Sequence, residues 1–306
     1  MDAKRVLIAA LVVITLIYFF NWWVMAKRKH QAGEHGHHEP VMPTPLQLAI
    51  GFVTNFFDTL GIGSYATTTA MFRAWKIVPD ELIPGTLNVG HVAPTVIQAI
   101  IYTQIVEVDF TTMALLIAAA CAGSWLGAGV VCGLPRRGVQ IGMGIALFGA
   151  ATIMLLQLLG AVPGGGAALA LSGVKLVLAF AGNFILGALM TLGIGLYAPC
   201  MIMISLLGMN PTAAFPIMMG SCAFLMPVGS LQFVRNNRYH LRAALGLALG
   251  GPLAVLIAAF IVKSLPLLYV RWMVVVIVIY TASTMLRTAA RERREAVAGR
   301  RMTQPA

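Results

Sequence analysis

The chain has little charge. Only 10% of its 306 residues are Asp, Glu, Lys or Arg, whereas 59% are hydrophobic. Soluble domains carry about a quarter charged residues, so this sequence has too little polar surface to cover a water-soluble fold. Its mean hydropathy is +0.87, and its charges lie between long apolar runs. This pattern is typical of membrane-spanning helices joined by short loops.

Cysteine pairs and catalytic motifs are also missing. The four cysteines, at positions 121, 132, 200 and 222, form no CxxC pair, which argues against a disulfide framework and a structural zinc site. The sequence contains no nucleophile elbow, P-loop, HExxH motif or paired-carboxylate pattern. We therefore expect a protein that is not an enzyme and that has no catalytic residues, no cofactor and no metal site.

Acidic residues are scarce, so the net charge is +11. Basic residues lie in predicted loops and in the tail, at 27–29, 136–137, 235–242 and 287–301. Such positions indicate cytoplasmic anchoring under the positive-inside rule rather than nucleic-acid binding. We expect a multi-pass protein of the cell inner membrane with a cytoplasmic C-terminal tail. The loop with Glu107 and Asp109 would be periplasmic, and the crossing count places the N-terminus outside.

The N-terminal segment, residues 1–29, predicts one retained transmembrane helix. Its apolar run is followed by Trp22, Trp23 and basic residues, not by a small-residue cleavage site. A His- and Pro-rich linker, residues 30–45, comes next. Four histidines within nine residues suggest metal binding, but the segment lacks a defined ligand geometry. A solvated linker is the simpler interpretation.

Two copies of one unit form most of the chain. Residues 59–66 and 191–198 agree at seven of eight positions, at an offset of 132. Ordered glycine and proline matches continue on both sides, and we assign residues 46–162 to repeat 1 and 163–290 to repeat 2. A basic cytoplasmic tail, residues 291–306, follows. Internal repeats of this kind are characteristic of secondary transporters.

Each repeat begins with an apolar stretch that a Gly-Ile-Gly break interrupts. Residues 46–58 and 64–75 are each shorter than the roughly 20 residues of a membrane span, so they predict two half-helices. The second leading arm is longer, which leaves a full crossing open there. Three ordinary spans follow each hairpin, at 84–105, 110–132 and 137–160, and at 212–234, 241–262 and 266–288.

The predicted fold is an all-α polytopic membrane protein. It contains two inverted repeats, each with a re-entrant or broken helical hairpin and three transmembrane helices, and one extra N-terminal transmembrane helix. The inversion follows from charge, because equivalent loops of the two repeats must face opposite sides of the membrane. That requires an odd number of full crossings in each repeat.

The breaks predict an anion site near the bilayer midplane. Non-helical backbone is tolerated at membrane depth only when it is buried in protein or faces a cavity. New helices begin after each break, at Ser64 and Leu196, and a helix N-terminus attracts anions. The alternative is that the glycines only permit close helix packing. We predict substrate contacts from Asn55, Thr59, Gly61, Gly63, Ser64, Thr67, Asn88, His91, Thr191, Gly193, Gly195, Tyr197, Cys200, Ser221 and Cys222.

Two ionisable residues within the predicted spans are candidates for proton coupling. Polar and ionisable side chains inside a membrane are costly, which makes them functional candidates. His91 could carry a proton or donate to an anion, and the alternative is a neutral histidine bonded to a neighbouring helix. Asp58 could take up a proton or cap local backbone. A carboxylate beside an anion would repel it unless protonated.

The duplicated glycine motif, Pro199 after its second copy, and the spacing of the spans resemble the TauE/SafE family of sulfite exporters and sulfonate permeases, over about residues 46–290. The resemblance implies gradient-driven transport of sulfite, sulfoacetate or a related organosulfur anion. We expect a secondary transporter whose partners are a small anionic substrate and the lipid bilayer. We expect no nucleic-acid partner, and the sequence leaves open whether the protein forms a homodimer. The alternative is a metal-cation transporter, or a metal-delivery or assembly membrane protein that uses the His-rich linker.

Overall fold

The chain is an all-α membrane protein. A computed structural model describes residues 3–31, 42–79, 82–131, parts of 141–159, 166–190, 195–264 and 266–303. These residues are 84% helical with no strand among them. Four of the described helices are long and apolar enough to cross a membrane: Ala3–Lys27, Gly173–Met190, Pro211–Arg235 and Leu241–Ile261. These findings confirm the predicted class, and linker residues 32–41 lie outside the described ranges.

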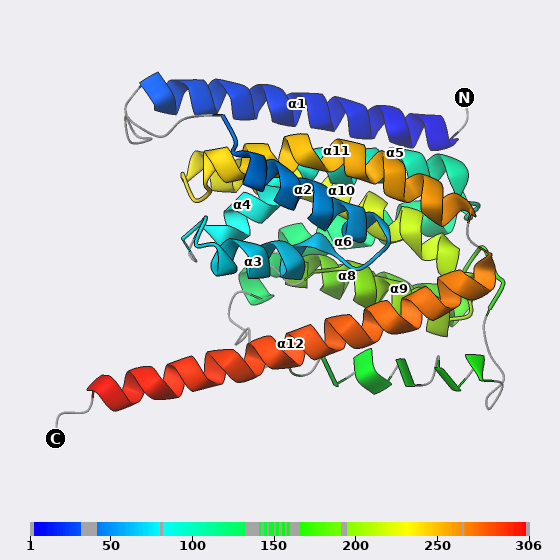
Figure 1. The fold of residues 1–306 in the computed structure, drawn as a ribbon. Coiled ribbons are helices and arrows are strands. Elements are labelled where there is room, and N and C mark those ends of the chain that lie inside the picture. The colour runs from blue at the N-terminus through cyan, green and yellow to red at the C-terminus, as the bar shows by residue number, and fades with distance from the viewer. Residues whose placement is uncertain are drawn as a thin grey trace.

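The helices form a layered bundle (Figure 1). Short helical stretches also occur within 141–159. In chain order the named elements are α1 (Ala3–Gln31), α2 (Pro45–Thr59), α3 (Ser64–Ala74), α4 (Ile83–Gly90), α5 (Val92–Ile105), α6 (Phe110–Val131), α8 (Gly173–Met190), α9 (Tyr197–Leu206), the 3-10 turn η1 (Pro211–Ala213), α10 (Ala214–Arg235), α11 (Leu241–Ser264) and α12 (Leu267–Thr303).

The first hairpin has two short arms. A capping box begins α2, in which the Thr44 hydroxyl accepts from the Gln47 N–H at 3.2 Å and the Gln47 side chain accepts from the Thr44 N–H at 2.9 Å. The helix has 15 residues and α3 has 11. Between them Gly61 and Gly63 have φ of 97° and 85°, a region open to glycine. Both arms are too short to span a bilayer, because a span needs about 20 residues.

The second hairpin is asymmetric. Its leading arm, α8, has 18 residues and is among the four helices that could cross a membrane, whereas α9 has 10. Break residues 191–194 lie outside the described ranges. The predicted span 84–105 is also divided, into α4 and α5. Proline has no N–H to donate, so Pro94 cannot bond the Gly90 carbonyl, and the helix is interrupted at His91.

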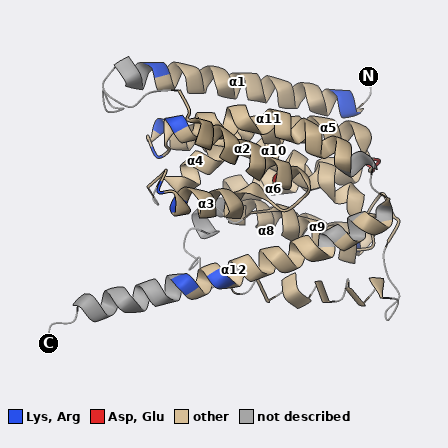
Figure 2. Cartoon of the chain, in the orientation of Figure 1, with Lys and Arg blue, Asp and Glu red and all other residues tan. Residues whose placement is uncertain are grey.

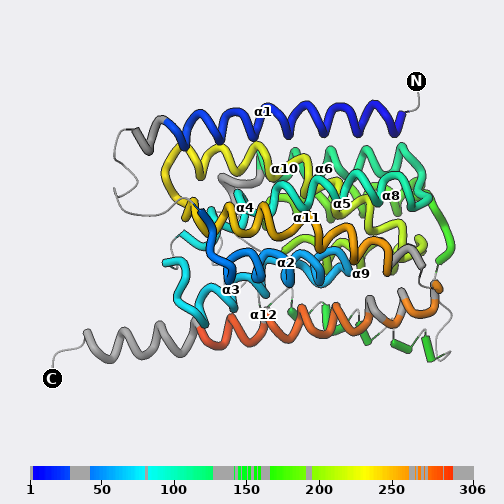
Figure 3. Tube along the Cα trace, turned by 45° about the horizontal axis from the view of Figure 1, so that its top comes forward, coloured from blue at the N-terminus to red at the C-terminus, as the bar shows by residue number. Residues whose placement is uncertain are grey.

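The helices of the two predicted repeats pack reciprocally. The leading arm of the first hairpin, α2, packs mainly on α11, and the leading arm of the second, α8, packs mainly on α6. In both views α1 and α12 lie on opposite sides of the bundle (Figures 1 and 3). The Tyr18 hydroxyl of α1 donates to the Val89 carbonyl at 3.3 Å. The Trp22 indole donates to the Tyr239 hydroxyl at 3.1 Å, so α1 is fastened to the bundle.

Charge is distributed unequally between the two ends of the bundle. Figure 2 shows most Lys and Arg at the end where α1, α3 and α10 finish and α11 begins. Arg73 and Arg235 stand in the last turns of α3 and α10 at this end. The loop between α5 and α6, with Glu107 and Asp109, lies at the other end, as does the start of α1. Basic residues therefore gather at one end of the bundle, and the assignment of that end to the cytoplasm stays a prediction from the charge pattern.

Helices α6 and α8 approach each other closely at Gly123. A Cβ atom at Gly123 would overlap the Phe184 carbonyl, so Gly123→Ala should lower the stability by about 1–3 kcal/mol, as overpacking does. The temperature of thermal unfolding in detergent measures this loss of stability. A Cβ at Gly229 would meet nothing within 4 Å, so Gly229→Ala should unfold at the wild-type temperature. Equal unfolding temperatures for the two variants would contradict the close packing.

Candidate functional site

The two glycine breaks meet at one pocket. Gly63 and Ser64 come from the first break, and Gly195 and Tyr197 come from the second. The volume of the cavity is about 20 Å³. That is room for about one or two waters, so the site is narrow in this conformation. The described lining residues are Asp58, Gly63, Ser64, Tyr65, Thr95, Met190, Gly195, Leu196, Tyr197, Cys222 and Met226.

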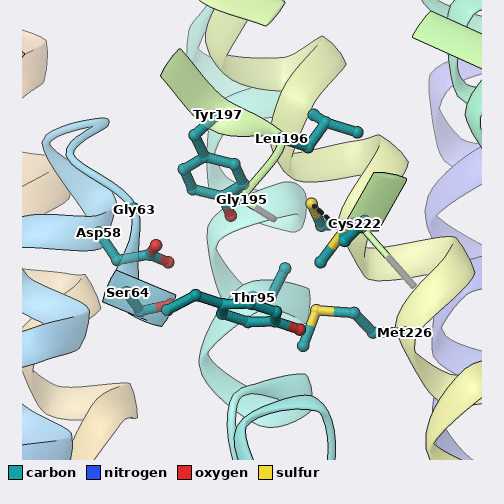
Figure 4. A pocket seen from close by; sticks show the side chains of 11 residues that line it. Asp58, Gly63, Ser64, Thr95, Gly195, Leu196, Tyr197, Cys222 and Met226 are labelled. Carbon is teal, nitrogen blue, oxygen red and sulfur yellow. Dashed lines mark hydrogen bonds between the residues drawn. The ribbon is translucent and has the colours of Figure 1, made fainter. Parts of the chain in front are cut away.

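The pocket has two chemically different walls (Figure 4). Asp58 and Ser64 carry oxygen on the side formed by α2 and α3, and the Tyr197 hydroxyl points toward the space between the walls. The opposite wall carries the sulfur atoms of Cys222 and Met226, which both belong to α10. The Cys222 Sγ lies 3.5 Å from the Met190 Sδ. A solute in this pocket would therefore contact oxygen-bearing groups on one side and soft sulfur atoms on the other.

Each break places the start of a helix at the pocket. Ser64 is the first residue of α3 and Tyr197 is the first residue of α9. The first N–H groups of a helix have no partner within it, and they carry a partial positive charge. The N-cap residues Gly63 and Leu196 give no side-chain cap, but the Asp58 carboxyl group accepts from the Ser64 N–H and side chain at the start of α3. The two helix starts therefore direct positive ends toward the same small volume.

Asp58 sets the charge of the pocket. Among the described lining residues it alone has a charged side chain, and it is 2% exposed. Its Oδ2 accepts a hydrogen bond from the Gln98 Nε2 at 2.9 Å. A small anion is therefore attracted by the helix starts and repelled by an ionised Asp58. Binding of the anion is favoured when a proton neutralises this carboxyl group.

Gln98 links the two breaks, although it lies behind the pocket. Its Nε2 also donates to the Thr59 Oγ1 at 2.9 Å, and its Oε1 accepts from the Tyr197 hydroxyl at 2.8 Å. The Thr59 hydroxyl donates its hydrogen to the Asn55 carbonyl at 2.7 Å. An ionised Asp58 carboxylate and the Thr59 oxygen can only accept hydrogen bonds. The Gln98 Nε2 must therefore face these two groups, and its Oε1 must face the Tyr197 hydroxyl.

His91 is bonded on both ring nitrogens. Its Nδ1 lies 3.0 Å from the Asn55 Oδ1, and its Nε2 lies 3.2 Å from the Thr68 Oγ1. Because the Asn55 Nδ2 donates to the Gly51 carbonyl at 2.7 Å, its Oδ1 is the acceptor and Nδ1 carries the hydrogen. The fully buried ring lies outside the pocket lining. This geometry favours the structural interpretation of His91 over a proton-carrying one.

Other predicted contact residues bond to protein groups. Thr67 donates to the Ser64 carbonyl at 2.9 Å, within its own helix. Asn88 accepts from the Tyr65 hydroxyl at 3.0 Å, and Ser221 accepts from the Asn183 side chain at 3.0 Å. Of the predicted substrate contacts, the pocket lining includes Gly63, Ser64, Gly195, Tyr197 and Cys222, and it does not include Asn55, Thr59, Gly61, Thr67, Asn88, His91, Cys200 or Ser221. Thr191 and Gly193 lie outside the described residues.

Sequence reasoning missed several residues at and behind the pocket. Thr95 and Gln98 are polar residues inside the apolar helix α5, and they are three positions apart, which places them on neighbouring parts of one helix face. The cost of polar groups in a membrane could have identified both. Met190 and Met226 gave no such signal, because methionine is common in apolar helices. Tyr65 and Leu196 also line the pocket.

Among the described residues, no group of three or more His, Cys, Asp or Glu side chains lies close enough to hold a metal ion. A comparison of the chain with family models, curated proteins and solved structures found no match. The resemblance to the TauE/SafE family therefore stays a prediction from its motifs, and the pocket supplies the chemistry from which a function can be proposed.

Proposed function

We propose that the chain is a multi-pass inner-membrane secondary transporter that carries a small sulfur-containing anion, such as sulfite or a sulfonate. The supporting observation is that both breaks line one pocket, with α3 and α9 each starting at its edge. Preorganised helix ends can hold an oxyanion without a buried lysine. Discontinuous helices that bind substrate between two repeats are a recurring feature of secondary transporters.

Inverted repeats are part of this proposal. The supporting observation is the reciprocal packing of α2 on α11 and of α8 on α6. A two-fold axis in the membrane plane would exchange these two pairs and would bring the tips of both hairpins to the same depth. Rocking of one repeat against the other would then open the pocket to each side in turn. Such a movement would also enlarge a pocket that is narrow in the present conformation.

Flux into proteoliposomes tests the proposal. Purified protein should take up radiolabelled sulfite faster than protein-free liposomes, and unlabelled sulfonates should compete. Uptake should increase when the side from which sulfite enters is made more acidic, because the anion and the Asp58 proton enter the pocket together. Absence of uptake for sulfite, sulfonates and thiosulfate at every pH, with correctly folded protein, would overturn anion transport.

Transport of a soft metal cation is the second candidate function. It is favoured by the combination of the Asp58 carboxylate with the sulfur atoms of Cys222, Met190 and Met226 in one pocket. Thiolate and thioether ligands select soft ions such as Cu(I). The same proteoliposomes decide between the two functions, since uptake of Ag(I) or Cu(I) without uptake of any anion would establish the cation reading.

A further inference from the structure

Gln98 occupies a position from which it can transmit the charge state of one break to the other. Its amide has 0% exposure. It bonds Asp58 and Thr59 at the end of α2 through Nε2, and Tyr197 at the start of α9 through Oε1. These contacts join residues that are separated by more than a hundred positions in sequence.

We propose that Gln98 is a positioning residue that makes the Tyr197 hydroxyl available to an anion only when Asp58 is protonated. The inference rests on the proposed anion transport. In the structure Gln98 Nε2 donates to the Asp58 carboxyl oxygen and Oε1 accepts the single hydroxyl hydrogen of Tyr197, which is the arrangement that an ionised Asp58 requires. The Tyr197 oxygen, which also bonds the Thr95 side chain of the pocket lining, then has no hydrogen to donate to the pocket, and this disfavours an anion.

Protonation of Asp58 reverses the chain of hydrogen bonds. The acid O–H donates to Gln98 Oε1 after a half-turn of the amide, and Gln98 Nε2 then donates to the Tyr197 oxygen. The Tyr197 O–H is released toward the pocket, where it donates to the anion. The proton stays on Asp58, so no covalent bond other than that O–H is made. Thr59 can accommodate the turned amide by rotating its hydroxyl hydrogen from the Asn55 carbonyl to Oε1.

The surroundings of Asp58 contain few other groups that could produce the same pH response. The titratable side chains that face it are Tyr65 from α3, Tyr197 from α9 and Cys222 from α10. From α5, Tyr102 donates to the carbonyl of the neighbouring Thr59 at 3.1 Å. The helix packed most extensively on α2 is α11, and it has no titratable residue between positions 242 and 263. Asp58 is therefore the single carboxyl group among these titratable side chains.

Infrared difference spectroscopy tests the relay without any anion. The band of the Tyr197 ring, assigned with Tyr197→Phe, should shift with pH in the wild-type protein. The shift should be absent in Asp58→Asn and in Gln98→Met, a variant of similar side-chain length that cannot relay. Gln104→Met is the matched control, because Gln104 is exposed on the same helix, and it should keep the wild-type shift. A wild-type shift in Gln98→Met would overturn the relay.

Sulfite binding by calorimetry provides a second readout. Gln98→Met and Tyr197→Phe should each weaken binding about ten- to hundredfold at acidic pH, the range expected for one hydrogen bond to a charged group. At alkaline pH the losses should be small. The double variant should bind no more weakly than Tyr197→Phe alone, and additive losses would contradict a shared pathway. If wild-type protein binds no sulfite at any pH, anion transport fails, while the infrared result still decides the relay.

Discussion

An Asp58→Asn variant is expected to bind a small sulfonate, an anion that stays ionised over the whole pH range, with an affinity that no longer depends on pH. In the wild-type protein an ionised Asp58 would share a narrow pocket with the anion. Two unit charges about 4 Å apart repel by about 4 kcal/mol at an effective dielectric constant of about 20. That energy corresponds to a loss of about a thousandfold in affinity. An asparagine has nearly the same shape and carries no charge, and its Nδ2 can donate to the Gln98 Oε1 as a protonated carboxyl group would.

The sign of the effect follows from linkage. Because the anion favours the protonated carboxyl group, wild-type affinity should fall as pH rises, by about tenfold per pH unit while Asp58 loses its proton. The variant should bind at alkaline pH as the wild type binds at acidic pH. It should also lose accumulation driven by a pH gradient, while it retains downhill exchange. Calorimetry over a pH series and proteoliposome uptake measure both effects.

Asp109→Asn is the matched control for Asp58→Asn. The Asp109 carboxylate accepts from the Thr112 N–H at 2.7 Å at the start of α6, and asparagine caps helices about as well as aspartate. This control should keep the wild-type dependence of binding on pH. A folded Asp58→Asn protein with the wild-type pH dependence would show that another group carries the coupled proton.

A Gly195→Val variant is expected to fold normally and to lose anion binding. Gly195 lines the pocket, and a Cβ atom there would meet nothing within 4 Å. The valine side chain would instead enter this cavity, whose volume is only about 20 Å³. We expect sulfite affinity to fall by about a hundredfold or more, the equivalent of at least about 2.7 kcal/mol. Thermal unfolding should stay close to that of the wild type.

Other glycines show why Gly195 is the sharper test. Gly61 has φ of 97°, and a Cβ atom there would overlap the Met201 side chain, so a bulky residue at Gly61 should disturb folding and binding together. Gly149 is exposed, and a Cβ there meets nothing within 4 Å. Gly149→Val should therefore retain both stability and binding. Wild-type sulfite affinity in a folded Gly195→Val protein would mean that the anion binds elsewhere.

The class of fold could be predicted from composition and pattern. A chain with so few charges must bury its backbone polar groups within helices, and the long apolar runs placed α10 and α11 close to their observed bounds. The first glycine break was also predictable, because arms of 15 and 11 residues are too short to cross a bilayer. The charge pattern indicated which end of the bundle is basic.

The composition of the pocket was decided by tertiary structure. Which polar side chain faces the pocket and which bonds a neighbouring helix depends on rotation and distance between helices, and periodicity along one helix does not contain either quantity. His91 and Asn55 are polar residues in apolar segments, as Gln98 is, yet the first two bond each other at 3.0 Å. Gln98 joins Asp58 to Tyr197 only because α2, α5 and α9 meet there.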